Sequence, residues 1–145
     1  MKGEKMIRIL LAILAVFAAW SVLDFVMHGV VLAAAYKATA QLWRPMNQMK
    51  MIVLHVTTLI AAIAFVIIYV RLISPKDIIR GLEYGLLFGI ATGVSMGFGT
   101  YSVMPIPLYM AFVWLIGSIV EMALGGIIVG AIIKEESTIK RLFGR

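Results

Sequence analysis

Four ionisable side chains lie inside stretches of sequence that are otherwise apolar enough to cross a lipid bilayer: Asp24, His28, His55 and Glu121. Ionisable groups are costly in hydrocarbon, so they usually turn toward the protein interior, pair with one another or line a pathway. These four residues are therefore the leading functional candidates. Tyr101 joins them as a residue that could close a vestibule holding His28, although with Tyr109 and Trp114 it also fits an aromatic belt at the outer membrane boundary.

The depths expected for these side chains suggest which of them meet. Asp24 and His28 are four positions apart, so on a helix they share one face and lie within reach of each other. By helical rise, they lie roughly 18 and 12 Å inside an outer boundary near Tyr36. His55 is expected at a depth comparable to that of His28, on the next span. Glu121 is expected close to the middle of the bilayer, where a carboxyl group holds a proton unless it is paired.

Several kinds of chemistry fit this set. His28 and His55 could ligate a haem from two adjacent antiparallel helices. Together with Asp24 they could hold a metal ion, since imidazole and carboxylate ligands suit borderline cations. A Cu(I) site could add the thioethers of Met27, Met46, Met49 and Met51. Asp24 and Glu121 could instead titrate along a proton or cation pathway, or all four groups could simply satisfy one another and nearby polar atoms.

The elements that carry these residues are predicted by hydropathy. Of the 145 residues, 63% are hydrophobic and only 14% are charged, whereas soluble domains carry about 25% charged residues. Four apolar stretches reach the length of a membrane-spanning helix. They cover approximately residues 7–36, 51–70, 82–103 and 108–133. We expect one all-α domain over residues 1–145, a four-helix transmembrane bundle, with the first span retained as a signal anchor.

The positive charges predict the orientation. Three Lys or Arg residues lie at the N-terminus, three in the second connection and four after the last span: Lys2, Lys5, Arg8, Arg71, Lys76, Arg80, Lys134, Lys140, Arg141 and Arg145. The opposite side has only Lys37, Arg44 and Lys50. The positive-inside rule therefore places both termini in the cytoplasm. Because these charges lie in loops and tails, the net charge of +6 is explained by topology and no nucleic-acid partner is expected.

Glycines recur every four residues along the third span, and more occur in the fourth. The two sets are Gly81, Gly85, Gly89, Gly93 and Gly97, and then Gly126 and Gly130 with Gly117 and Gly125. Small residues at this spacing let helix backbones approach closely in lipid. We interpret them as packing the helices of one chain, with an interface to another subunit as the alternative.

Several longer strings are similar to a family of small uncharacterised bacterial four-helix integral membrane proteins. They are residues 24–29 (DFVMHG), 42–45 (LWRP), 99–107 (GTYSVMPIP) and 117–130 around Glu121. The resemblance spans nearly the whole chain. It implies the four-helix fold and a location in the bacterial cytoplasmic membrane, and it implies no activity, ligand or functional residue. His55 is not part of the pattern.

The sequence favours a non-enzymatic protein. No phosphate-binding glycine loop, catalytic serine arrangement or cysteine is present. The leading expectation is a binding or accessory subunit that associates, through its glycine-rich helices, with itself or with other membrane subunits in the lipid bilayer. The alternatives are a small proton- or cation-coupled transporter or channel using Asp24 and Glu121, and a haem or metal protein using His28 and His55.

Overall fold

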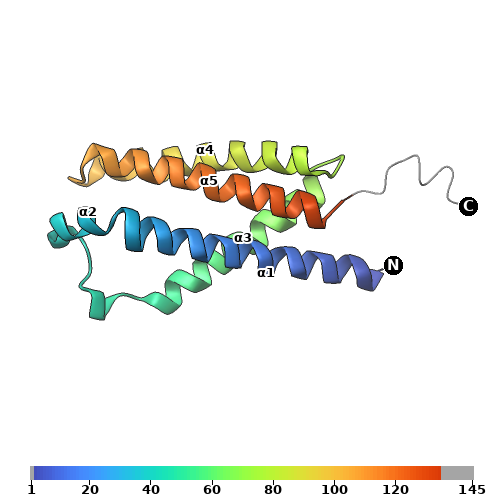
Figure 1. Ribbon diagram of the computed structural model, residues 1–145, viewed down its shortest axis with the longest axis horizontal. Helices are drawn as coiled ribbons and strands as arrows, with labels where there is room; N and C mark the ends of the chain where they lie inside the picture. Colours follow the sequence, from blue (N-terminus) through green and yellow to red (C-terminus); the bar gives the residue numbers. More distant parts are fainter. Residues whose placement is uncertain (1, 135–145) are drawn as a thin grey trace, which may run out of the picture.

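The structure is a computed structural model that describes residues 2–134, and these residues form helices joined by short connections (Figure 1). The four long helices are α1 (Lys2–Val26), α3 (Met51–Leu72), α4 (Ile78–Val103) and α5 (Leu108–Ile132). Between α1 and α3 lie a π-helical turn (Met27–Val31), the short helix α2 (Ala33–Ala38) and two 3-10 turns (Ala40–Leu42 and Met46–Gln48). No strand occurs within residues 2–134.

All four long helices are long and apolar enough to cross a membrane, which confirms the four predicted apolar helices and indicates a multi-pass membrane protein. The bounds differ at several ends: α1 covers Lys2–Val26 where the span was predicted at 7–36, and α3 ends at Leu72 where it was predicted to end at 70. Helix α4 begins at Ile78, four residues before the predicted span, because Asp77 caps it. The Asp77 Oδ1 atom accepts a hydrogen bond from the Arg80 backbone N–H at 2.8 Å, which satisfies one of the free donors of the first turn.

Helices α4 and α5 form the most extensive helix pair, a hairpin joined by the turn at residues 104–107. The five regularly spaced glycines of α4 are all buried and face α5. A Cβ atom added to Gly81 would fall on the carbonyl oxygen of Gly126, and one added to Gly89 would lie 2.7 Å from the Ile119 Cα. The two backbones therefore touch along a surface that has no room for side chains.

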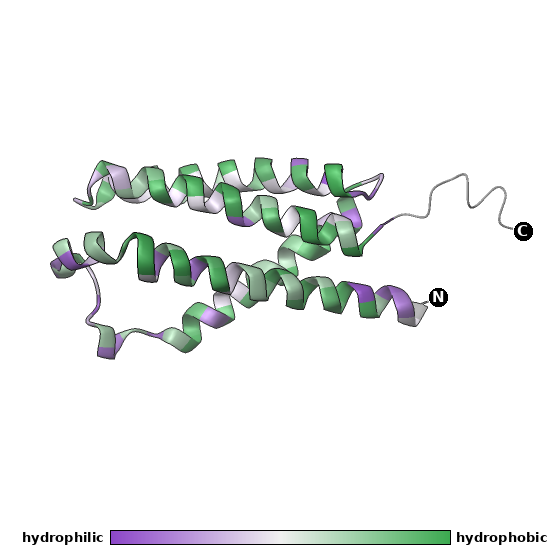
Figure 2. Ribbon diagram, viewed as in Figure 1, coloured by the Kyte–Doolittle hydropathy of each residue, from purple (hydrophilic) through white to green (hydrophobic). Residues whose placement is uncertain are grey.

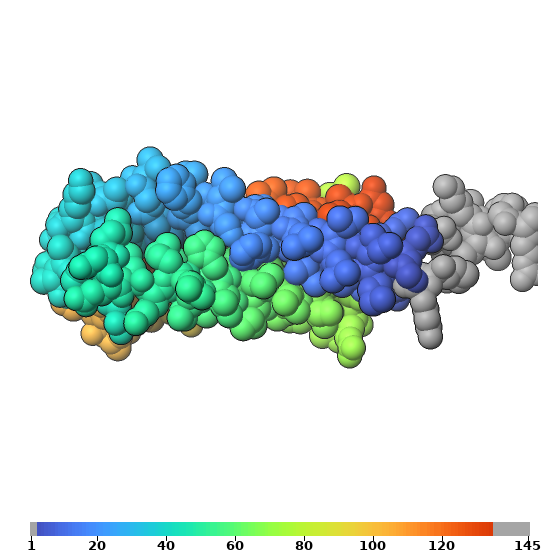
Figure 3. Space-filling model, turned by 90° about the horizontal axis from the view of Figure 1, so that it is seen from below, coloured from blue at the N-terminus to red at the C-terminus, as the bar shows by residue number. Residues whose placement is uncertain are grey.

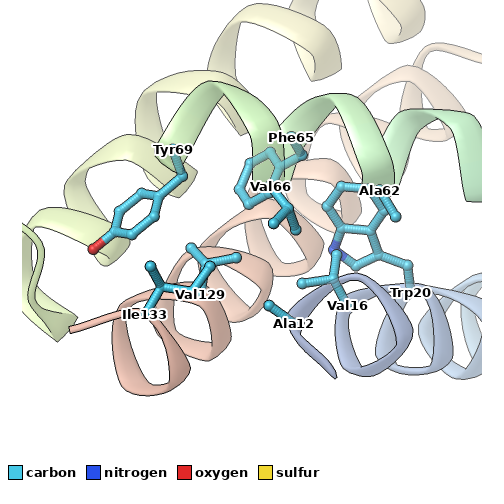
Figure 4. Packing of buried hydrophobic residues seen from close by; sticks show 9 residues of the cluster. All are labelled: Ala12, Val16, Trp20, Ala62, Phe65, Val66, Tyr69, Val129 and Ile133. Atoms are coloured by element: carbon cyan, nitrogen blue, oxygen red, sulfur yellow. The ribbon is translucent and has the colours of Figure 1, made fainter. Parts of the chain in front are cut away.

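Helices α1, α3 and α5 share a second contact region, which Figure 4 shows from close by. It contains Ala12, Val16 and Trp20 of α1, Ala62, Phe65, Val66 and Tyr69 of α3, and Val129 of α5 followed by Ile133. The Trp20 and Phe65 rings meet edge to face at a centroid distance of 5.2 Å. Tyr69 donates a hydrogen bond to the carbonyl oxygen of Asp77 at 2.9 Å, which ties the end of α3 to the start of α4.

Only the second half of α3 takes part in this core. Figure 1 shows the first turns of α3 standing away from α1, and residues 51–57 are all exposed. Seen from below, α1 and α3 make up most of the visible face (Figure 3). The first half of α3 is thus an unpartnered helical surface within the chain.

The two ends of the molecule differ in the number of Lys and Arg residues that the structure describes there. Residue 2, the α3–α4 connection and the end of α5 lie at one end, and the α2–α3 connection and the α4–α5 turn lie at the other (Figure 1). Hydrophilic residues gather near these ends and in the connections, while the helices between them are mostly hydrophobic (Figure 2). Three of the predicted inner charges, Lys140, Arg141 and Arg145, lie outside the described residues.

Candidate functional site

The candidate site lies where α1 meets α5, and glycines on α5 make that contact close. A Cβ atom added to Gly117 would fall on the sulfur of Met27, and one added to Gly125 would lie 2.9 Å from the Trp20 Nε1 atom. These two glycines are four residues before and four residues after Glu121, so all three share one face of α5. The close approach on both sides of Glu121 therefore brings its side chain against α1.

Trp20 fixes this contact from the α1 side. Its indole Nε1–H donates a hydrogen bond to the backbone carbonyl oxygen of Glu121 at 2.8 Å, and the indole is 3% exposed. In an α-helix that carbonyl already serves as an acceptor for the following turn, and its second lone pair accepts the indole. A bond that Trp20 makes to backbone holds α5 at a fixed height beside α1, whatever the protonation state of the Glu121 carboxyl.

The Glu121 carboxyl is buried and incompletely paired. The residue is 9% exposed, and its Oε1 atom has no hydrogen-bond partner among the described residues. The neighbour that the structure supplies is a second acid, because the Asp24 carboxyl of α1 is near enough to repel a charge on Glu121. A proton or a cation bound between two such carboxyl groups relieves that repulsion.

A chain of polar groups leads from Asp24 toward the α2 end of the molecule. The Asp24 Oδ1 atom lies 3.9 Å from His28 Nε2, and His28 Nδ1 lies 2.6 Å from the Tyr36 hydroxyl oxygen. That oxygen also accepts a hydrogen bond from Trp114 Nε1 at 3.2 Å. The Trp114 indole N–H can only donate, so the Tyr36 oxygen accepts from it and the Tyr36 hydroxyl is free to donate to His28 Nδ1. The proton of the His28 ring is then on Nε2, which faces Asp24.

The π-helical turn explains how His28 and Tyr36 meet although they are eight residues apart. The turn at Met27–Val31 contains the wider bond from Leu32 N–H to the Met27 carbonyl, at 2.9 Å. The ring of Tyr36 then reaches back toward the N-terminal direction, as long helical side chains do. Single π-turns inside α-helices occur frequently at functional sites. Here the turn carries His28 itself.

A groove of about 320 Å³ runs between α1 and α5 beside this cluster. Because the helices are antiparallel, Leu23 and Glu121 mark one end of it, and Val31 and Val113 mark the other. The remaining lining residues are Val26, Met27, Ile116, Gly117 and Val120. Glu121 is the only ionisable residue in an otherwise apolar lining.

The structure brings together three of the five residues predicted for the polar cluster: Asp24, His28 and Glu121. His55 is exposed on the free half of α3, with its Nδ1 atom 2.8 Å from the Met51 carbonyl oxygen. Tyr101 is exposed as well. In the described part of the chain, no hydrogen bond, ion pair or ring contact joins either residue to the cluster.

The haem and metal hypotheses gain no geometric support from these positions. Among residues 2–134, no group of three or more His, Asp or Glu side chains is placed to hold a metal ion. Of the methionines considered for Cu(I), Met27 packs on Gly117, whereas Met46, Met49 and Met51 are exposed. Cofactor binding through His28 and His55 stays a prediction.

Tyr36, Trp114 and Trp20 belong to the site although sequence reasoning did not include them. From the sequence, Tyr36 served only to mark the outer boundary, Trp114 was assigned to the aromatic belt there, and Trp20 had no role. The sequence does contain one indication for Tyr36: it follows His28 by eight residues, which is close to two helical turns and puts both side chains near the same face of a helix. No comparable signal exists for Trp114 or Trp20, whose partners lie 78 and 101 residues away in sequence.

Comparisons with protein-family models, with curated proteins and with solved structures give no match to this chain. The fold and the site geometry are therefore the basis for a functional proposal.

Proposed function

We propose that this chain is a small proton- or cation-coupled transporter that binds its ion at the Asp24–Glu121 pair. The observation that carries the proposal is the unpartnered Glu121 Oε1 atom, on a carboxyl that is nine-tenths buried and faces a second carboxyl. A purely structural polar contact would be expected to satisfy such an atom, because an unpaired buried polar group costs about 1–3 kcal/mol. A proton or a cation supplies the missing partner.

The pair can work as an exchange site for charge. With one proton bound, the two acids together carry a single negative charge. When a monovalent cation binds and that proton leaves, the net charge of the site is unchanged. Because the net charge of the site stays the same, replacing the proton by the cation does not add a charge to an apolar environment, which would be expensive. His28 and Tyr36 give the departing proton a route toward the α2 end, by way of the 2.6 Å contact between them.

The proposal includes a topology. The described positive charges at the end that contains residue 2 outnumber those at the α2 end, and the positive-inside rule then puts both termini in the cytoplasm. The α2 end and the Tyr36 end of the polar chain would face outward. With the resemblance to small bacterial membrane proteins, this supports a location in the bacterial cytoplasmic membrane, with the lipid bilayer as solvent for all four helices.

Association with another subunit remains a separate proposal with its own surface. The five α4 glycines are buried against α5, so they offer no surface to a partner. The exposed first half of α3 does offer one, and it favours an accessory role in which α3 contacts a second copy or another membrane subunit. Cross-linking from cysteines placed at positions 52 and 56 in native membranes tests this role, and monomeric products only would count against it.

Carbodiimide labelling tests the transporter proposal without knowledge of the ion. Dicyclohexylcarbodiimide is apolar and reacts with protonated carboxyl groups, so in membranes it should modify the Asp24–Glu121 pair. Glu83 is a matched control, because it is exposed and forms a 2.7 Å ion pair with Arg80. Mass spectrometry should find the label on the wild type and on Glu83→Gln, and should find much less on Glu121→Gln.

Vesicle measurements then test coupling. Reconstituted vesicles with an acidic interior are mixed with salts of sodium, potassium or a quaternary ammonium ion, and a pH-sensitive dye follows the loss of the gradient. The wild type and Glu83→Gln should exchange internal protons for an external cation, and Glu121→Gln should not. Equal labelling of wild type and Glu121→Gln, or equal gradients in all vesicles with every cation offered, would refute the proposal.

A further inference from the structure

The groove beside Glu121 differs from a site for a small hydrated ion. An inorganic cation is held by several oxygen ligands or retains water, and both arrangements need polar walls. The walls here are Leu23, Val26, Val31 and other apolar side chains, with Glu121 as the one ionisable group. The site therefore pairs one negative charge with a surface that suits hydrocarbon.

We infer that the α1–α5 groove binds a lipophilic organic cation, an amine or quaternary ammonium compound with apolar substituents. This inference rests on the proposed function and names the substrate class of the same site. The apolar substituents would lie along the groove, and the positive centre would lie at the Glu121 end. A groove of about 320 Å³ is at the lower limit of the range for small-molecule sites, which is roughly 300–1,000 Å³.

Charge complementarity selects a cation over a neutral or anionic ligand. The Glu121 Oε1 atom has no partner among the described residues, and Asp24 lies beside it. An anion at this end would meet two acids. The titratable groups next to the pair are His28 of the π-helical turn and Tyr36 of α2, which lie beyond Asp24. The glycines of α4 pack on a different side of α5. No Lys or Arg lies among the residues that line the groove.

The flexible Met27 side chain on one wall of the groove suits ligands of different shapes. Met27 lies over Gly117, and the absence of a Cβ at Gly117 is what leaves room for its thioether. Methionine side chains adapt to irregular apolar surfaces, because they are unbranched and polarisable. The Met27 side chain can therefore move aside when a larger substituent enters, whereas the backbone contacts between α4 and α5 cannot.

The test uses two ions of the same shape and opposite charge, tetraphenylphosphonium and tetraphenylborate. Binding to the purified full chain in mild detergent is followed by equilibrium dialysis and by proton release into weakly buffered solution. We expect tetraphenylphosphonium to bind and to release one proton for each cation bound. We expect tetraphenylborate to bind at least about tenfold more weakly, a difference of roughly 1.4 kcal/mol.

Two variants separate the groove from the carboxyl. A side chain at position 117 would displace the flexible Met27 thioether, whereas one at position 125 would meet the rigid Trp20 ring. Gly117→Leu should therefore fill the groove with Glu121 still in place, so that cation binding is lost and carbodiimide labelling is retained. Glu121→Gln should abolish both, and its helix content by circular dichroism should match that of the wild type. Glu83→Gln should change neither measurement.

The possible results divide clearly. Equal binding of the two ions, or unchanged cation binding in Gly117→Leu, would overturn the ligand assignment. If carbodiimide labelling still depended on Glu121 in that case, the proton site would stand without this substrate. Loss of selective binding together with loss of Glu121-dependent labelling would remove both the inference and the proposed function.

Discussion

Replacing Gly85 with Ala tests the close contact between α4 and α5. The added methyl would fall on the carbonyl oxygen of Met122 and would lie 3.0 Å from the Ala123 Cα. Two carbon atoms are comfortable at about 3.5–4.0 Å, so the helices would have to separate by roughly 0.5–1 Å. The obstructing atoms belong to the backbone, and no side chain can rotate away to relieve the contact.

Gly99→Ala is the matched control for the magnitude. It makes the same substitution in the same helix, and nothing lies within 4 Å of the added atom. The gain in helix propensity from glycine to alanine, about 1 kcal/mol in water, is common to both variants and cancels in their comparison. Overpacking costs about 1–3 kcal/mol, and the rigid backbone puts this site at the upper end. Gly85→Ala should therefore be about 3 kcal/mol less stable than Gly99→Ala.

The assay is unfolding in mixed micelles of a mild detergent and sodium dodecyl sulfate, followed by circular dichroism. The Gly85→Ala transition should occur at a clearly lower fraction of dodecyl sulfate than that of Gly99→Ala, with similar slopes. Coincident transitions would refute the reasoning, because they would show that α4 and α5 do not depend on backbone contact at Gly85.

Three further substitutions test single contacts. Tyr36→Phe leaves the buried Trp114 N–H without its acceptor and should cost about 1–3 kcal/mol in the same unfolding assay; a cost below experimental error would argue that water replaces the phenol. Asp77→Ala removes the α4 cap and should cost about 1 kcal/mol, and hydrogen exchange should rise in the first turn of α4 only. Unprotected amides there in the wild type would contradict the cap. His55→Ala should leave both stability and labelling of Glu121 unchanged, and reduced labelling would place His55 in the site after all.

Hydropathy was sufficient to predict the four long helices, because the length of each apolar run is set by the membrane it must cross. It could not predict their ends, which depend on local hydrogen bonds. Helix α4 starts four residues earlier than its apolar run because Asp77 supplies a cap. The first apolar run is not one α-helix up to Tyr36, since the π-helical turn and a second break at Leu32 divide it.

The meeting of Asp24, His28 and Glu121 lay only partly within reach of the sequence. Spacing predicts the Asp24–His28 contact, and helical rise gives the depth of each residue. Depth says nothing about which helices are neighbours or how far each is rotated. For that reason His55, at a depth similar to that of His28, seemed an equal candidate, although its helix stands away from α1 at this level. Glu121 meets Asp24 because the face of α5 that carries Glu121 packs on α1.

Two glycine faces on α5 account for the position of the site. Gly126 faces α4, and its own added Cβ would fall on the Gly81 carbonyl oxygen. Gly125, the next residue back, faces Trp20 of α1. Adjacent helical positions are about 100° apart, so α5 is held by close contacts on two sides at once. Glu121 shares the α1 face with Gly125 and Gly117, and the rigid α4 contact prevents α5 from turning its carboxyl outward. If this is the cause, Gly125→Leu should reduce carbodiimide labelling of Glu121 more than Gly99→Leu does, although neither changes an ionisable group.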